Sequence, residues 1–179
     1  TQRIYITIRD ALGKYSREVT PSKKGASREL NRIKHLMSYR IATKNICSVR
    51  SSDVAEFRDY LITKGYAPAT VKKYLELLSV LFNTAISEWG YESLANPVSQ
   101  IRKPLIRNGR TRRLDHNEEQ ILLDAASTHK GGWLRPVIIL AIETGMRRSE
   151  IANLKVKDIN IEKRVAVLHE TKNGDSRHV

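Results

Sequence analysis

The segment Thr-Gly-Met-Arg-Arg-Ser-Glu, residues 144–150, joins two apolar stretches of the chain that have helical periodicity, 134–142 and 149–154. Gly145 can take the left-handed backbone conformation that ends a helix, because it has no Cβ. Arg147 then falls at the start of the next helix, where backbone N–H groups are unpaired and a bound phosphate is favoured. Glu150 is three residues further on, close enough to orient that guanidinium. The alternative is an ordinary helix–turn–helix corner with a surface Arg–Glu pair.

The whole chain is strongly basic. Its 179 residues include 32 Lys or Arg and 19 Asp or Glu, which gives a formal net charge of +13. Such an excess repels itself unless the partner is a polyanion, so we expect a nucleic acid first and an anionic membrane second. The hydrophobic fraction of 40% is that of a globular protein with one sizeable domain or two small ones. No apolar run is long enough to cross a bilayer, so we expect no membrane partner.

Cysteine and acidic residues limit the chemistry. Cys47 is the single cysteine, which excludes an internal disulfide and makes a zinc cluster a poor prediction. The sequence has no tight Asp/Glu/His cluster, so we expect no metal and no cofactor. A reducing compartment fits best, namely the cytoplasm with association to the nucleoid.

Residues 1–100 have the periodicity of a helical bundle. Helices are predicted over 5–19, 27–40, 53–64 and 68–89, and the last is the clearest, with Pro68 at its start and Gly90 at its end. Asp53 and Glu56 have the spacing of a capping box. The predicted inner positions of the last three helices are Leu30, Ile33, Leu36, Met37, Val54, Phe57, Leu61, Ile62, Val71, Tyr74, Leu75, Leu78, Leu81, Phe82, Ala85 and Trp89.

Basic residues on two of these helices are candidates for duplex contact. They are Arg28, Arg32 and Lys34 in the second helix and Lys72 and Lys73 in the fourth. Lysine and arginine on neighbouring helices can grip a phosphate backbone, whereas the alternative is two ordinary solvated faces. The net charge favours the first interpretation slightly.

Residues 101–113 are predicted to be a linker between two domains. Pro104 and Gly109 argue against a continuous helix, and the charges all have one sign. A solvated hinge does not explain that bias, so we expect DNA contact through Arg102, Lys103, Arg107, Arg110, Arg112 and Arg113.

Residues 114–179 predict a mixed α+β segment. Asp115 and Glu118 form a second capping-box pattern, followed by predicted inner positions at Ile121, Leu122, Ala125 and Ala126. The nearly uninterrupted apolar run 133–142 predicts a buried helix. Alternation over 165–170 predicts a strand, and Asn173-Gly174 is a strong hairpin signal with Lys172 just before it.

These motifs together resemble the tyrosine recombinase (phage integrase) family. In the C-terminal part, the resembling residues are 143–154, 158–160, 170–174, Arg177 and Val179. In the N-terminal part, they are Tyr15, 23–25, 70–74, Ala85, 88–89 and 96–97. It covers nearly the whole chain. It implies a SAM-like core-binding bundle of four to five helices over 1–100, and a truncated catalytic domain over 114–179 with helices and a small antiparallel hairpin.

The resemblance also implies residue roles. Arg147 matches the first catalytic arginine, which clamps the scissile phosphate, and Glu150 matches the acidic residue that supports it. Lys172 matches the hairpin lysine that protonates the leaving 5′ oxygen, and Thr70 joins the DNA contacts. Arg148 is assigned to the surface or to a neighbouring phosphate.

The nucleophile of the family has no match in this chain. The family's second arginine motif, histidine positions and nucleophilic tyrosine lie beyond the hairpin, and the last tyrosine here is Tyr91. We therefore expect an N-terminal piece of a recombinase that binds double-stranded DNA without cutting it. Its full-length parent would cut and rejoin DNA through a 3′-phosphotyrosine intermediate, as a homotetramer on DNA.

Two other functions remain open. One is a non-enzymatic architectural or regulatory DNA-binding protein with a recombinase-like fold. The other is an RNA-binding protein of ribosomal type, which ranks lower because only 6% of the residues are aromatic and could stack on unpaired bases.

Overall fold

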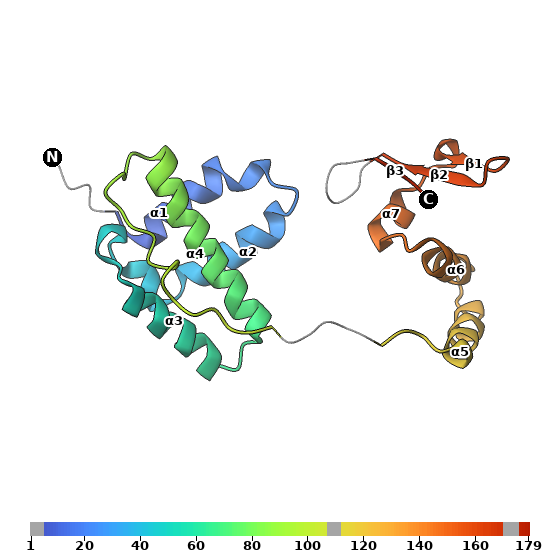
Figure 1. The fold of residues 1–179 in the computed structure, drawn as a ribbon, viewed down its shortest axis with the longest axis horizontal. Coiled ribbons are helices and arrows are strands. Elements are labelled where there is room, and N and C mark those ends of the chain that lie inside the picture. The colour runs from blue at the N-terminus through green and yellow to red at the C-terminus, as the bar shows by residue number, and fades with distance from the viewer. Residues whose placement is uncertain (1–5, 107–111, 170–175) are drawn as a thin grey trace. The chain divides into compact units, whose positions relative to one another are not determined.

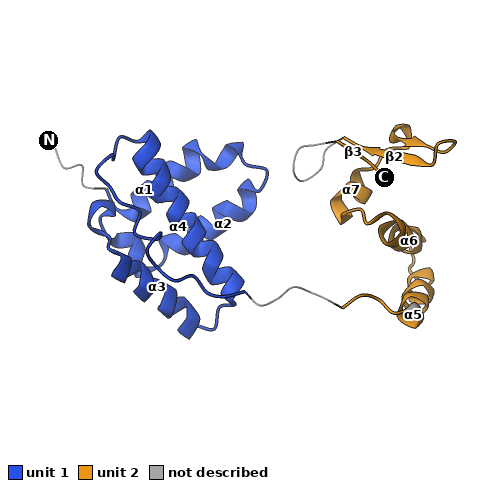
Figure 2. Ribbon diagram, in the orientation of Figure 1, with its two compact units in different colours: residues 1–109 blue, residues 110–179 orange. Residues whose placement is uncertain are grey.

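Residues 6–106, 112–169 and 176–179 are described by a computed structural model, which divides the chain into two compact units. The first unit is 1–109 and the second is 110–179 (Figure 2). The division falls within the stretch 101–113, which the sequence assigns to a linker. No helix in the described parts of the chain is both long enough and apolar enough to cross a bilayer.

The first unit is a bundle of α-helices joined by short turns (Figure 1). Its helices are α1 (Ile8–Glu18), α2 (Ala26–Met37), α3 (Ser51–Thr63) and α4 (Pro68–Glu88). Three 3₁₀ turns lie between them: η1 (Thr20–Ser22), η2 (Arg40–Thr43) and η3 (Ile46–Ser48). The longest helix, α4, packs against α1, α2 and α3, so it forms the centre of the bundle.

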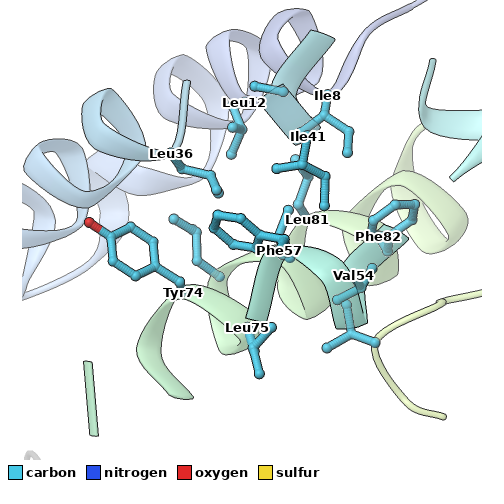
Figure 3. Close-up of a cluster of buried hydrophobic side chains, with 14 of the residues drawn as sticks. Ile8, Leu12, Leu36, Ile41, Val54, Phe57, Tyr74, Leu75, Leu81 and Phe82 are labelled. Atoms are coloured by element: carbon cyan, nitrogen blue, oxygen red, sulfur yellow. The ribbon is translucent and has the colours of Figure 1, made fainter. Parts of the chain in front are cut away.

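The core of the first unit is built on the inner face of α4. Tyr74, Leu75, Leu81 and Phe82 meet side chains of the other helices, among them Phe57 of α3 (Figure 3). The predicted stripe of α4 is confirmed: its members from Val71 to Ala85 are buried, and Trp89 packs against the cluster. A helix with an apolar residue at every third or fourth position buries one continuous face, which explains why the pattern was readable.

Three predictions about α2 and α3 were wrong. Helix α3 begins at Ser51, with Arg50 as the N-cap residue, so Asp53 stands at the third helical position. Its carboxylate accepts the backbone N–H of Arg50 at 2.9 Å, and Glu56 is exposed. Leu30 and Ile62 are also exposed, because each lies at the side of an inner face already filled by its neighbours.

The second unit has three helices followed by a small antiparallel sheet. Its elements are α5 (His116–Ser127), α6 (Leu134–Thr144), α7 (Arg148–Asn153), the 3₁₀ turn η4 (Val156–Asp158), β1 (Ile159–Asn160), β2 (Val165–Leu168) and β3 (Arg177–His178). The strand order is β1-β2-β3, with Ile159 opposite Ala166 and Leu168 opposite Arg177. The predicted hairpin turn at Asn173-Gly174 lies outside the described residues. The sequence did not predict β1, which is only two residues long.

Burial of the second unit was overestimated from the sequence. Helix α6 contacts α5 and α7, and these neighbours leave Trp133 56% exposed and Ile139 and Ile142 partly exposed. On α5 the buried side chains are Leu123 and Ala126, whereas the predicted inner residues Ile121, Leu122 and Ala125 are exposed. An apolar sequence shows what a helix could bury, but the number of neighbours decides what it does bury.

Truncating the centre of the bundle is expected to destabilise the first unit. Leu78 is fully buried on α4, so Leu78→Ala should lower the free energy of unfolding by about 2–5 kcal/mol, through lost contacts and a cavity. Val80→Ala, at an exposed position two residues on, should change it by only about 0.5 kcal/mol. Denaturant unfolding measures both, and equal losses would contradict this packing.

Candidate functional site

The corner between α6 and α7 presents Arg147. Gly145 has φ 62° and donates its N–H to the carbonyl of Ala141 at 3.0 Å, which ends α6 as the sequence predicts. Met146 is buried and anchors the corner. Arg147 has an extended backbone, φ −71° and ψ 150°, and is the N-cap residue of α7.

Glu150 holds both the backbone and the side chain of Arg147. Its Oε2 accepts the Arg147 backbone N–H at 2.8 Å, and its Oε1 accepts Nη1 of the Arg147 guanidinium, also at 2.8 Å. The Glu150 side chain is only 3% exposed, whereas that of Arg147 is 50% exposed. The close approach of Glu150 to this guanidinium, which the three-residue spacing predicts, is therefore present; its supporting role at a phosphate stays a prediction.

A second arginine shares the same carboxylate. Nη2 of Arg177, on β3, donates to Oε2 of Glu150 at 2.8 Å. Arg177 lies in the motif that resembles the family, but the sequence assigned it no role. Glu150 and Arg177 are 27 residues apart in the chain, so no local periodicity could have indicated the contact.

The surroundings of Glu150 keep its carboxyl group ionised. The hydrogen bond from the Arg147 backbone is the largest cause, followed by the Arg147 side chain, and Arg177 adds to them; burial acts in the opposite direction. Together they lower the pKa of Glu150 from the ordinary 4.5 to about 2. Two guanidinium groups around one carboxylate leave the site with a net positive charge at neutral pH.

The exposed side of Arg147 can bind an anion. One guanidinium nitrogen, Nη1, is engaged with Glu150, and half of the side chain faces solvent. A planar guanidinium can donate two parallel hydrogen bonds to a phosphate or carboxylate, which a lysine ammonium cannot do. The arrangement therefore suits a phosphate held in a fixed orientation.

A hollow of about 740 Å³ lies beside this carboxylate, between α7 and β2. Its lining includes Glu150, Lys155, Lys157 and the pair Asp158 and His169, whose Oδ1 and Nε2 are 3.2 Å apart. In the described parts of the chain, no group of three or more His, Cys, Asp or Glu side chains could hold a metal ion.

Comparison with known proteins shows which protein family the chain matches. Residues 112–179 match the phage integrase family. A shufflon-specific DNA recombinase of Escherichia coli is 38% identical over 181 residues, which are 97% of this chain and 47% of that protein. The chain belongs to the phage integrase, or tyrosine recombinase, family.

Solved structures agree with this tyrosine recombinase fold. A lambda integrase dimer bound to a COC′ core site matches with a TM-score of 0.79 and 22% identity, over 97% of this chain and 62% of that one. A lambda integrase tetramer bound to a Holliday junction matches with a TM-score of 0.78 and 22% identity, over 99% and 49%. The chain spans about half the length of the curated relatives it matches.

Of the three residues that the recombinase motif assigns to one site, the structure brings Arg147 and Glu150 together. Lys172 lies outside the described residues, so its approach to Arg147 stays a prediction. The strands on either side of it are described: β2 ends at Leu168, and β3 begins at Arg177, the residue that contacts Glu150.

The candidate DNA contacts of the first unit lie on α2 and α4, which pack against each other. Arg28, Lys34 and Lys73 are exposed, and Arg32, Thr70 and Lys72 are half-buried. Lys73 Nζ pairs with Glu76 at 2.9 Å and lowers the pKa of that carboxyl. The ammonium group of Lys73 has further N–H donors beside the one used by Glu76, and a phosphate would have to share or replace that contact.

The candidate contacts of the recombinase linker are divided between the two units. Arg102 and Lys103 are exposed, and the carbonyl of Arg102 accepts Nη1 of Arg58 at 3.0 Å. Arg112 pairs with Glu118, and Arg113 is exposed. Arg107 and Arg110 lie outside the described residues. Arg58, which the sequence did not single out, joins the start of the linker to α3 through this bond.

The lowered pKa of Glu150 predicts a pH-dependent contribution to stability. Above about pH 4.5 the carboxylate is charged in both states and contributes fully; as the pH falls towards 2, the unfolded chain takes up the proton first and the contribution is lost. Glu150→Gln should therefore lower the melting temperature at pH 7 and have little effect near pH 2.

Glu143→Gln, at an exposed carboxylate on α6, is the matched control and should have little effect at either pH. Thermal melts followed by circular dichroism measure the difference. A Glu150→Gln effect of the same size at both pH values would contradict the ion pair.

Proposed function

We propose that this chain is the DNA-binding part of a site-specific recombinase, whose full-length parent cuts and rejoins duplex DNA through a 3′-phosphotyrosine intermediate. The observation that carries the proposal is the Arg147–Glu150 pair, held at the family's motif by a buried carboxylate. Arg147 binds the scissile phosphate, Glu150 holds Arg147, and Lys172 protonates the leaving 5′ oxygen.

The proposed roles suit the chemistry of the reaction. Attack of a tyrosine oxygen on a phosphodiester builds negative charge on the non-bridging oxygens, and a fork of two N–H donors stabilises that charge well. The leaving alkoxide needs a proton, which an ammonium group can supply as a general acid. Because Glu150 fixes the guanidinium before DNA arrives, little reorganisation is needed when the phosphate binds.

We propose double-stranded DNA as the partner, gripped by the basic residues of the first unit and of the linker. The charge of +13 supports this, since neutralising phosphates releases counterions and strengthens binding. The lambda integrase structures, a dimer on a core site and a tetramer on a Holliday junction, support a homotetramer on DNA for the parent. A protein with this substrate works in the cytoplasm, associated with the nucleoid.

The alternative is a DNA-binding regulator with a recombinase fold and no strand cleavage. The basic charge and the fold support it as well, since both suit duplex binding without strand cleavage. The coding sequence beyond the codon for Val179 discriminates the two. An open frame with His-x-x-Arg and a late tyrosine supports the enzyme, and a stop codon supports the regulator.

Duplex binding by this chain should depend steeply on salt. The slope of log Kobs against log salt is negative, and replacing Lys72 with glutamine should reduce its magnitude by about 0.9, the value for one lost phosphate contact on B-DNA. Lys14→Gln is the control, because Lys14 packs over Trp89 and pairs with Glu18 on α1. Fluorescence anisotropy measures both; no affinity for any duplex at moderate salt would contradict DNA binding.

In the full-length parent, Arg147 should be essential for covalent trapping of DNA. Arg147→Ala should abolish the protein–DNA adduct, and Arg147→Lys should impair it strongly because one ammonium cannot form the fork. Arg148→Ala is the matched control and should retain most of the adduct. Gel analysis of trapped complexes on a nicked substrate is the measurement, and an unimpaired Arg147→Lys variant would exclude the bidentate clamp.

A further inference from the structure

Arg177 is the one residue of β3 that reaches the Arg147 corner. Its Nη2 donates to Oε2 of Glu150, the same oxygen that accepts the Arg147 backbone N–H. Its side chain is 40% exposed, while the carboxylate that it contacts is almost completely buried. Arg177 therefore supplies a second positive charge to a group that burial would otherwise destabilise.

The contact constrains how Glu150 can hold Arg147. Oε1 is bonded to the Arg147 guanidinium, and Oε2 has two donors on its other side. With both oxygens engaged, the carboxylate has one orientation, and so does the guanidinium bonded to it. If Arg177 is removed, each oxygen keeps one donor, both of them from Arg147, and the carboxylate loses the only one of these three donors that comes from another element and holds it independently of Arg147.

The same contact joins two parts of the second unit. Arg177 pairs with Leu168 across β2 and β3, and its guanidinium reaches α7. Its Nε is buried, and no described residue accepts a hydrogen bond from it. Among the described residues, Glu150 is thus the hydrogen-bond partner of this guanidinium.

We propose that Arg177 is a positioning residue, which acts through Glu150 to keep the Arg147 guanidinium oriented for a DNA phosphate. This inference rests on the proposed function, because it takes phosphate as the ligand of Arg147. Arg177 itself does not contact the DNA. It differs from an additional phosphate contact in one measurable way: its effect on DNA binding requires Arg147.

A double-mutant cycle tests that requirement in the 179-residue chain. The variants are Arg147→Gln, Arg177→Gln and their combination, with Arg148→Gln as the control for losing one charge from this unit. Duplex affinity and its salt slope are measured by fluorescence anisotropy, and folding is checked by circular dichroism.

The expected result is a non-additive cycle. Arg177→Gln should weaken wild-type binding by more than Arg148→Gln does. In the Arg147→Gln background, it should weaken binding by no more than Arg148→Gln does. Equal effects of Arg177→Gln in both backgrounds would overturn the proposal, since Arg177 would then act on the DNA independently.

A second readout follows the contact in the free protein. Carbon-13 NMR titration of the Glu150 carboxyl group should show its pKa rising in Arg177→Gln from about 2 towards the ordinary 4.5, and Arg177→Lys should restore part of the shift. An unchanged Glu150 pKa in Arg177→Gln would overturn the proposal even if DNA binding is intact. If wild-type protein binds no duplex, the proposed function fails instead, and the titration still decides whether Arg177 holds Glu150.

Discussion

The buried carboxylate of Glu150 is the constraint on which the second unit depends. A charge removed from water needs close partners, and this one has three donors, two from Arg147 and one from Arg177. The donors come from the α6–α7 corner and from β3, so a single side chain joins helices and sheet. The chain has to bring these elements together for Glu150 to be buried at all.

The burial of Glu150 also explains why the Arg147 guanidinium at the corner is held in one orientation. Arg147 uses one nitrogen to meet Glu150 and keeps half of its side chain in solvent, so the guanidinium is both fixed and available. A cation held in advance binds an anion with less loss of freedom than a mobile one. The family relationship and the local chemistry therefore both support the proposed ligand, the phosphate of a nucleic acid.

Local chemistry was readable from the sequence. Gly145, Arg147 and Glu150 lie within six residues, and the helix end and the ion pair follow from conformational freedom and a three-residue spacing. The inner face of α4 and the capping box of Asp115 with Glu118 were predictable for the same reason. Each depends only on residues within one or two helical turns.

Features that depend on distant parts of the chain were not readable. The exposure of α6 is set by how many elements cover it, and its own apolar sequence carries no information on that number. The bond from Arg177 to Glu150 joins positions 27 residues apart through a sheet whose first strand has no sequence signal. Asp53 was misassigned because Arg50 and Asp53, three residues apart, could each begin the same helix pattern.

The most direct test of the central claim is the mobility of the Arg147 guanidinium in the free protein, measured by ¹⁵N relaxation of its Nε–H group. A side chain held by a buried carboxylate should have an order parameter of about 0.85, the value of rigid backbone, while Arg148 should lie below about 0.6. Glu150→Gln should bring Arg147 down to the level of Arg148. Equal, high mobility of Arg147 and Arg148 in the wild-type protein would contradict the claim that Glu150 holds the corner ready for a phosphate.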